Sequence, residues 1–353
     1  MIRKIKNSDK TPEDRLKEKV NFFFGNKYDD LINARVKCVE GDIILDELIV
    51  EETVREEVAK NVSMIINSAA HVKHYGDINL FTRINAKGVE NLAKFALANN
   101  MRLIHISTLS VSGNILEVGQ LDQVGIVKGT IYNETNLYIG QNLDNVYAYT
   151  KFLGEEVVYN YILKGLDAKV MRMGNLTSRI SDGKFQPNVE ENAFANRLKT
   201  FVDIGIMPNN LMDFNVEFTP IDLAAKAIRV LANTDKKYNT YHIFNDNHIV
   251  MHRLDEILYK LGYELRHITK EQMTELIEFY SKQDNGYERI QGIIQDVNRN
   301  KEIDYNPNTV IKSDFTKDVL SKLGFIWPEI DEEYITKYIE YLEKIGFLKG
   351  DNK

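Results

Sequence analysis

The sequence predicts an α/β protein with a doubly wound parallel sheet and a smaller, mainly helical C-terminal region. Three observations lead to this prediction. Short apolar runs alternate with longer segments whose apolar residues recur at helical spacing through the first two-thirds of the chain. The runs are too short for helices and end in small or polar residues. From about residue 234 helical patterns dominate, so we divide the chain into a sheet domain at 1–234 and a helical region at 235–353.

Four of the short runs are predicted to be buried parallel strands, at 36–42, 63–70, 102–108 and 168–175. Two segments, 80–100 and 147–165, are predicted to be crossover helices that end at Asn or Gly. Ligands of doubly wound sheets bind outside the carboxyl ends of the strands. In this chain those ends carry Asp42, Ala69, Ala70, Ser107, Thr108, Gly174 and Asn175.

The helical region is predicted to contain one more strand, 240–246, which we expect to return to the sheet. Four helices are expected after it, at 252–262, 269–283, 313–324 and 331–346. Ser313 and Asp331 are the expected N-caps of the last two, and Gly324 and Gly346 their C-terminal stops.

Composition excludes several classes of function. The 353 residues are 43% hydrophobic and 27% charged, with a net charge of -7, which argues against binding to a nucleic-acid backbone. No apolar run approaches the roughly 20 residues that span a bilayer, and the N-terminus lacks a signal-peptide core, so we expect a cytoplasmic protein. Cys38, the single cysteine, is expected to be a packed thiol. His71 and His74 have no acidic ligand nearby in sequence, so no metal site is expected.

Tyr147 and Lys151 lie four residues apart at the start of the predicted helix 147–165. Tyr147 is the only one of the 18 tyrosines with a lysine at this spacing, although about one or two such pairs are expected by chance. A tyrosine hydroxyl transfers protons poorly at neutral pH unless a nearby charge favours its phenolate, and one helical turn places the lysine on the same face. A hydroxyl at a strand end, such as that of Thr108, could hold a substrate carbonyl oxygen. The alternative is a helix-face aromatic beside a solvated lysine.

The ordered sequence blocks favour the catalytic interpretation. They are NFFFGNKYDDLINARVKCVEGDI, IINSAAHVKHYGDINLFTRINAKGVENLAKFA, HISTLSVSG, YAYTKFLGEEVV, RMGNLTSRISDGKFQPNVEENAF and VEFTPIDLAAKAI. With these blocks the chain resembles the extended short-chain dehydrogenase/reductase superfamily. Within it, the chain is similar to the terminal thioester reductase domains of nonribosomal peptide synthetases and carboxylic acid reductases. The resemblance implies a Rossmann-like sheet.

The resemblance also implies residue roles. Thr108, Tyr147 and Lys151 would be the catalytic set: Thr108 and Tyr147 would polarise a thioester carbonyl, and Lys151 would bind the nicotinamide ribose and lower the pKa of the tyrosine. The remaining cofactor-binding positions would be Arg3 at the 2'-phosphate of NADP, Asp42 and Ile43 on the adenine side, Ala69, Ala70 and Ser107 at strand ends, and Gly174 and Asn175 beside the nicotinamide.

Some of these positions have alternative interpretations, and one departs from the family pattern. Arg3 is equally interpretable as one of several charges at the N-terminus. His71 and Asn85 match the family but have a packing or capping role as an equal alternative. Met173 replaces the proline that usually precedes Gly174 and Asn175, which would loosen the turn without removing a reactive group.

The implied activity is reduction of a carrier-bound acyl or peptidyl thioester by NADPH, giving an aldehyde that some members reduce again to an alcohol. The implied partner is a phosphopantetheinyl carrier-protein domain, and the chain would be a monomeric domain of a larger synthetase. The C-terminal helices and residues 178–200 would form the substrate mouth. Against this, the sequence has no Gly-rich phosphate-binding turn, since its first glycine is the isolated Gly25, and we expect an N-terminally truncated sheet.

Three other functions remain possible at this point. One is a fatty acyl-CoA reductase. Another is a sugar-nucleotide epimerase of the same superfamily, against which NFFFGNKYDDL and DGKFQPNVEENAF argue. The third is a non-catalytic remnant that only docks on a carrier protein, suggested by the missing turn.

Overall fold

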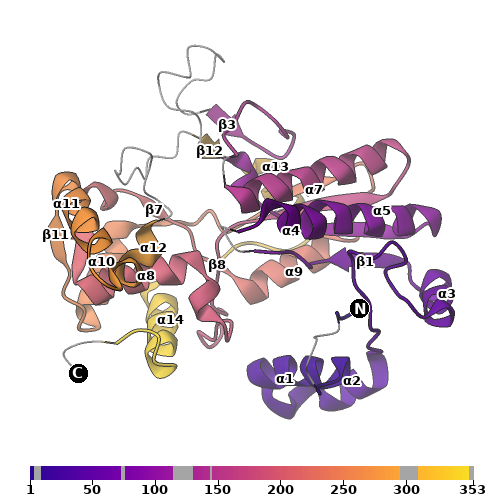
Figure 1. Cartoon of the computed structure of the whole chain (residues 1–353), viewed down its shortest axis with the longest axis horizontal. Coiled ribbons are helices and arrows are strands. Elements are labelled where there is room, and N and C mark those ends of the chain that lie inside the picture. The colour runs from indigo at the N-terminus through magenta and orange to yellow at the C-terminus, as the bar shows by residue number, and fades with distance from the viewer. Residues whose placement is uncertain (4–8, 73–75, 114–129, 144, 295–308, 350–353) are drawn as a thin grey trace. The chain divides into compact units, whose positions relative to one another are not determined.

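The computed structural model describes residues 1–3, 9–72, 76–113, 130–143, 145–294 and 309–349 (Figure 1). The chain separates into two compact units, each assembled from several stretches. The first unit contains Met1–Gly113, Gln141–Arg172 and Thr234–Tyr241, and the second contains Asn114–Gly140, Met173–Asn233 and His242–Lys353. The predicted division at residue 234 stays a prediction, and the interleaving of the stretches was not predicted.

The predicted α/β fold class is confirmed. The main sheet has the strand order β1-β2-β4-β9. Its strands are β1 (Met64–Asn67), β2 (Arg102–Thr108), β4 (Ala168–Met173) and β9 (Thr240–Ile243). β1 and β2 run parallel, with Met64 opposite Arg102. The strands therefore form within the predicted segments 63–70, 102–108, 168–175 and 240–246.

The strand predicted at 36–42 is wrong. These residues make only an isolated parallel bridge between Ile2 and Glu40. Ile2 donates its backbone N–H to the Val39 carbonyl at 2.8 Å and accepts from the Gly41 N–H at 3.2 Å. A strand requires a neighbouring strand with a continuous row of donors and acceptors. Within the described residues, only Ile2 provides such a neighbour here.

Two helical segments cover β2 in the first unit. The first is continuous through α4 (Ile78–Thr82), the π-helical turn η2 (Arg83–Lys87) and α5 (Gly88–Ala98). The second is α7 (Val146–Leu163), which packs beside α5 (Figure 1). Both predicted helices are thus confirmed. Their inward side chains, together with those of β2 and β4, form the core of this unit, in which Val89, Ala93, Leu103, Val158 and Val170 are buried.

The other helices of the first unit have no fully buried residue, although Val54 and Val58 pack, partly buried, against its core. These helices are α1 (Pro12–Phe24), η1 (Gly25–Tyr28), α2 (Asp29–Arg35) and α3 (Glu52–Asn61). A short 3-10 turn, η3 (Leu109–Ser112), follows β2 directly and buries Leu109, Val111 and Ser112.

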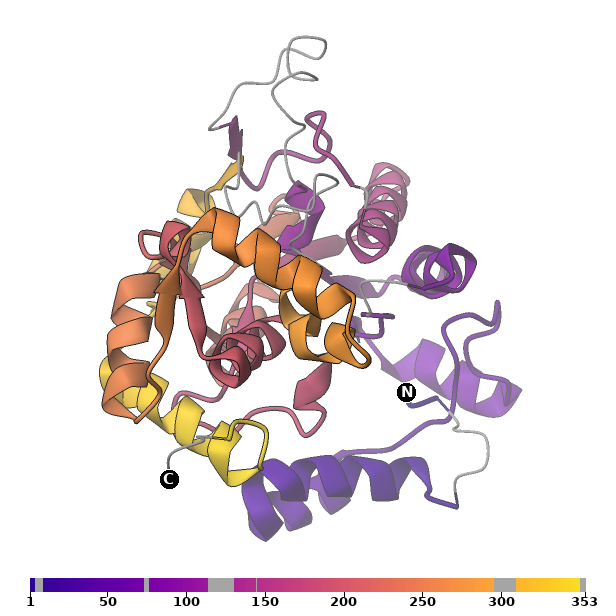
Figure 2. The same ribbon diagram turned by 60° about the vertical axis from the view of Figure 1, so that its left-hand side comes forward.

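The second unit is mainly helical, and the four helices predicted in it are confirmed. Its helices are α8 (Ala193–Ile204), α9 (Ile221–Leu231), α10 (Met251–Lys260), α11 (Lys270–Ser281), α12 (Gly286–Ile294), α13 (Asp314–Lys322) and α14 (Glu332–Lys344), with 3-10 turns η4 (Val189–Glu191) and η5 (Asn209–Leu211). α12 contacts both α8 and α11 (Figure 2). No helix in the described part of the chain is long and apolar enough to cross a membrane.

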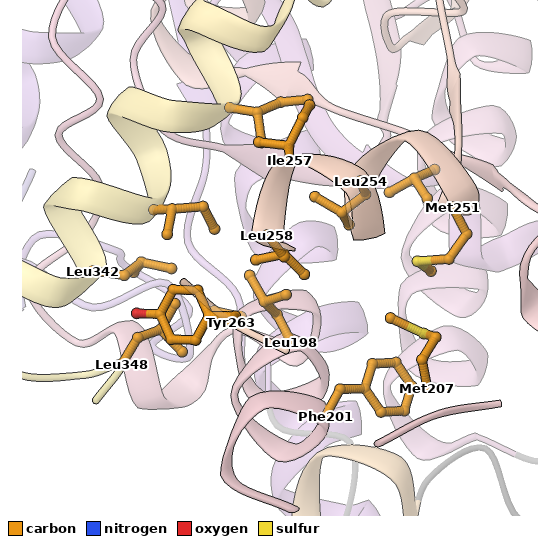
Figure 3. Packing of buried hydrophobic residues seen from close by; sticks show 14 of the residues in the cluster. Leu198, Phe201, Met207, Met251, Leu254, Ile257, Leu258, Tyr263, Leu342 and Leu348 are labelled. Atoms are coloured by element: carbon orange, nitrogen blue, oxygen red, sulfur yellow. The ribbon is translucent and has the colours of Figure 1, made fainter. Parts of the chain in front are cut away.

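Short strand pairs complete the second unit. The parallel pairs are β3 (Thr130–Tyr132) with β12 (Thr309–Ile311), β5 (Leu176–Thr177) with β8 (Thr219–Pro220), and β6 (Ile206–Pro208) with β11 (Arg266–Ile268); β7 (Asn215–Val216) and β10 (Ile249–Val250) pair antiparallel. The core of this unit lies among α8, α10 and α14, where Leu198, Leu258 and Leu342 converge (Figure 3).

Candidate active site

Thr108 and Tyr147 meet at the carboxyl end of β2. Thr108 is the last residue of that strand, and Tyr147 lies in the first turn of α7, which begins after the N-cap Asn145. The Thr108 hydroxyl lies near that of Tyr147, and it donates to Oγ of Ser110 at 3.0 Å. Burial raises the pKa of Tyr147, and the nearby hydroxyl of Thr108 opposes this only in part. The phenol therefore stays protonated at neutral pH and can act as a hydrogen-bond donor.

Lys151 lies one helical turn after Tyr147, and its side chain is buried. Its Nζ donates to the backbone carbonyl of Ile106 on β2, at 2.6 Å. Burial lowers the pKa of Lys151 to about 8, while the carboxylate of Glu155 acts in the opposite direction. Burial is the largest influence on the pKa of Tyr147, and the expected lowering of that pKa by Lys151 stays a prediction.

A buried ion pair that the sequence analysis missed lies next to these residues. Glu155 on α7 and Arg172 on β4 have fully buried side chains, and Nη2 of Arg172 is 2.7 Å from Oε2 of Glu155. The hydroxyl of Ser107 donates to Oε1 of Glu155 at 2.6 Å. Ser107 thus directs its hydroxyl toward α7, and its predicted contact with a cofactor stays a prediction. The spacing in the sequence could have identified Glu155, because Tyr147, Lys151 and Glu155 recur every four residues on one helical face.

Two asparagines hold the backbone that follows β1. Oδ1 of Asn67 accepts from the N–H of Ala69 at 3.1 Å. Asn85, in the π-helical turn, accepts from the N–H of His71 at 2.8 Å and donates to its carbonyl at 3.0 Å. Asn85 therefore has the capping role that was one of its two interpretations. Ala69 is exposed and Ala70 partly so, which leaves small side chains at this edge of the sheet.

The predicted adenine-side residues lie elsewhere in the first unit. Ile43 is buried and packs against Gly88, where an added Cβ would come within 2.7 Å of its side chain. Asp42 accepts from the N–H of Ile44 at 3.1 Å. Arg3 is exposed, and its carbonyl accepts from Arg15. Nothing in these contacts tests a cofactor role, so all three assignments stay predictions.

Gly174 and Asn175 belong to the second unit, where they contact Glu217. The N–H of Asn175 donates to Oε1 of Glu217 at 2.6 Å, and its Nδ2 donates to the Glu217 carbonyl at 3.0 Å. A Cβ at Gly174 would lie 2.1 Å from the same Oε1, so only glycine fits there. Burial raises the pKa of Glu217 to about 7. Sequence analysis did not identify Glu217, because nothing in its block distinguishes a partly buried carboxyl from an exposed one.

The residues at the end of β2 suit the nicotinamide-ribose end of a dinucleotide. An ammonium has three N–H donors, and Lys151 directs one of them to Ile106. Thr108 and Tyr147 add hydroxyls beside it.

The described residues include no Gly-rich turn for the pyrophosphate. They also include no group of three His, Cys, Asp or Glu suited to a metal ion, and His74 lies outside them. Cys38 is partly buried, and burial raises the pKa of its thiol.

Comparison with known proteins identifies the family. Residues 1–228 match the model of the male sterility protein family, an NAD-binding family. The chain belongs to this family. As a male sterility family member it is an oxidoreductase of the extended short-chain dehydrogenase/reductase superfamily, and its cofactor is of the nicotinamide class.

The proteins similar to this family member include reductases of two kinds. A solved thiolation-reductase di-domain from an archaeal nonribosomal peptide synthetase is 33% identical, with a TM-score of 0.83 over 98% of this chain and 70% of that one. A linear gramicidin synthase of Brevibacillus parabrevis is 22% identical over 91% of this chain, which spans only 6% of that protein. Fatty acyl-CoA reductase 8 of Arabidopsis thaliana is 23% identical over 66% of this chain and 56% of that protein.

Proposed function

We propose that this chain reduces an acyl or peptidyl thioester, carried on the phosphopantetheine arm of a carrier protein, with NADPH as the reductant. The observation that carries the proposal is that the hydroxyls of Thr108 and Tyr147 lie near each other at the end of β2, with Lys151 on the next helical turn. The similarity to a di-domain that joins a thiolation domain to a reductase supports the carrier-protein partner.

The side chains have separable roles in the proposed reaction. Thr108 and Tyr147 would donate hydrogen bonds to the thioester carbonyl oxygen, and Tyr147 would give its proton to that oxygen as negative charge develops. NADPH, when bound, supplies the hydride. Lys151, which is mainly charged at neutral pH, would hold the ribose hydroxyls. Loss of the thiol then gives an aldehyde, and a second reduction gives an alcohol.

Other parts of the proposal rest on the resemblance alone. Arg3, Asp42 and Ile43 would lie on the adenine and 2'-phosphate side of NADPH. Ala69, Ala70, Gly174 and Asn175 would let the cofactor approach the backbone, and 178–200 with the C-terminal helices would admit the phosphopantetheine arm.

Tyr147→Phe tests the proposal directly. Loss of a proton donor of this kind reduces kcat by about 100-fold or more. NADPH consumption with a pantetheinyl thioester is the measurement. The matched control is Tyr149→Phe, because Tyr149 lies on the same helix with its side chain exposed, and it should keep the wild-type rate. Equal rates for wild type and Tyr147→Phe would contradict the proposed role.

A fatty acyl-CoA reductase is the second candidate, favoured by the similarity to such reductases from Arabidopsis thaliana and Drosophila melanogaster. The same three side chains would serve either thioester. The two candidates are separated by comparing kcat/KM for one acyl group attached to a carrier protein and to coenzyme A. A preference for coenzyme A would replace the carrier-protein proposal.

A non-catalytic remnant is the third candidate, because the described residues include no Gly-rich turn. Titration of NADPH into the 353-residue chain, followed by nicotinamide fluorescence, tests it. We expect saturable binding with micromolar affinity that weakens in Lys151→Met. Absence of binding by the folded chain would favour the remnant.

A further inference from the structure

The buried ion pair between Glu155 and Arg172 has no part in the reaction described above. Both side chains have no exposed surface. Nε of Arg172 lies 3.1 Å from each carboxylate oxygen, and its Nη2 lies 2.7 Å from Oε2. Removing two charges from water is costly, and a well-packed apolar pair often serves stability as well or better. The pair is therefore a candidate for a role in function.

The charged and titratable groups around Lys151 indicate which role the ion pair has. Glu155 follows it by one turn on α7, and Tyr147 precedes it by one turn. On β2, His105 is fully buried, and both burial and Lys151 lower its pKa well below the usual range. On β4, Arg172 is bound by Glu155. Among these described groups, Glu155 is the only carboxylate, and it forms an ion pair with Arg172.

The protonation of His105 can be assigned from its neighbour Asn67. Oδ1 of Asn67 accepts from the N–H of Ala69 at 3.1 Å, which fixes the orientation of its amide. Its Nδ2 therefore faces Nδ1 of His105, at 3.3 Å, as a donor. The imidazole then carries its proton on Nε2 and is neutral. His105 thus supplies no charge that could replace that of Glu155.

We propose that Glu155, held in place by Arg172 and Ser107, is a positioning residue that keeps Lys151 protonated and directed at the end of β2. Two contacts support the geometric part. Ser107 donates to Glu155, and the preceding residue Ile106 accepts from Lys151. Consecutive residues of β2, directly before Thr108, are thus tied to two side chains one turn apart on α7. The positioning role of Glu155 depends on the proposed function only in its expected effect on the reaction rate.

The electrostatic part follows from burial. Burial lowers the pKa of Lys151 to about 8, and Glu155 is the group that opposes this. Without the carboxylate, the ammonium loses its one stabilising charge in a water-excluded site. Lys151 should then lose its proton within the neutral range of pH.

The test uses the double variant Glu155→Gln/Arg172→Met. Glu155→Gln alone would leave a buried, unpaired guanidinium that threatens folding, whereas the double variant removes both charges. Glu156→Gln is the matched control, because it changes the net charge on the adjacent residue and Glu156 is partly exposed. The readout is the pH titration of the Lys151 Cε resonance in ¹³C-lysine-labelled protein, assigned by its loss in Lys151→Arg.

We expect the pKa of Lys151 to fall by about one unit in the double variant and to stay unchanged in Glu156→Gln. The alkaline limb of kcat/KM should move by the same amount. An unchanged Lys151 titration in the folded double variant would overturn the proposal. Glu155→Asp withdraws the carboxylate by one methylene and should give a smaller shift in the same direction, so it provides the test if the double variant does not fold.

The two proposals fail in different ways. If Tyr147→Phe is as active as wild type, the proposed reaction mechanism fails while the Lys151 titration still reports on Glu155. If Tyr147→Phe is inactive and the titration is unchanged, the role of Glu155 alone is wrong.

Discussion

Burial shifts the pKa values of the candidate catalytic groups in opposite directions. It raises the pKa of Tyr147 and lowers that of Lys151 to about 8. Both groups are consequently protonated at neutral pH: the tyrosine as a neutral donor and the lysine as a cation. A donor and a cation side by side suit a reaction in which negative charge develops on a carbonyl oxygen.

Glu217 gives a residue-scale prediction for pH dependence. Its pKa rises from 4.5 to about 7 in the folded state, so between these values the folded state retains a proton that the unfolded state has lost. The contribution of Glu217 to stability therefore falls as pH rises through this window. Glu217→Gln stays neutral and can still accept from Asn175. The Tm difference between Glu217→Gln and wild type should therefore be more favourable to the variant at about pH 8 than at about pH 5.

The control for this prediction is Asp213→Asn, at an exposed carboxylate nearby in the chain. Its Tm difference from wild type should not change between the two pH values. The same Tm difference for Glu217→Gln at both pH values would contradict the raised pKa.

At the scale of the element, the helical patterns in the sequence correspond to observed helices, whereas the strand pattern at 36–42 does not correspond to a strand. α7, α10, α11, α13 and α14 form within the predicted segments or within a residue of them. A helix makes its backbone hydrogen bonds within itself, so its local pattern is sufficient. The segment 36–42 has an equally regular pattern but forms only one bridge, because a strand depends on partners elsewhere in the chain.

Two predicted N-caps differ in the structure and give an element-scale prediction. Oδ1 of Asp331 accepts from the N–H of Tyr334 at 2.8 Å at the start of α14. Ser313 precedes α13 but makes no side-chain cap, and its buried hydroxyl has no hydrogen-bond partner among the described residues. Asp331→Ala should reduce the free energy of unfolding by about 1 kcal/mol. Ser313→Ala should leave it unchanged or slightly raise it, and urea unfolding of both variants checks the difference.

An equal loss in the two alanine variants would mean that the hydroxyl of Ser313 caps its helix after all. No loss of stability in Asp331→Ala would show that the carboxylate stabilises the start of α14 no more than water does.

At the scale of the whole molecule, the described residues form two hydrophobic core clusters. One lies among α5, α7 and the sheet, and the other among α8, α10 and α14. The candidate catalytic residues Thr108, Tyr147 and Lys151 belong to the first unit, whereas Gly174 and Asn175 belong to the second. The second core consists mainly of aliphatic and aromatic side chains from helices (Figure 3).

Substitution of Leu258 tests how much the second core contributes to the free energy of unfolding. Its side chain is fully buried in α10, so Leu258→Ala should cost about 2–5 kcal/mol of stability through lost transfer free energy and the cavity left behind. Val50→Ala is the control, because Val50 is 76% exposed and should change stability by about 0.5 kcal/mol or less. Chemical unfolding measures both. A loss below about 1 kcal/mol for Leu258→Ala would indicate that the site collapses around the smaller side chain.

The sequence by itself determined the fold class and six of the helical segments, because these follow from local periodicity. It also proposed Thr108, Tyr147 and Lys151 as candidate residues, from their spacing and from the family resemblance, and their roles stay predictions. The tertiary structure decided what surrounds them. Glu155 and Arg172 are 17 residues apart in sequence and read as ordinary surface charges, as does Glu217. Only packing shows that Glu155 and Arg172 are buried and that Glu217 is partly buried. Burial is the physical cause of the shifted pKa values of Lys151 and Glu217. The same dependence on distant partners explains why residues 36–42 form no strand.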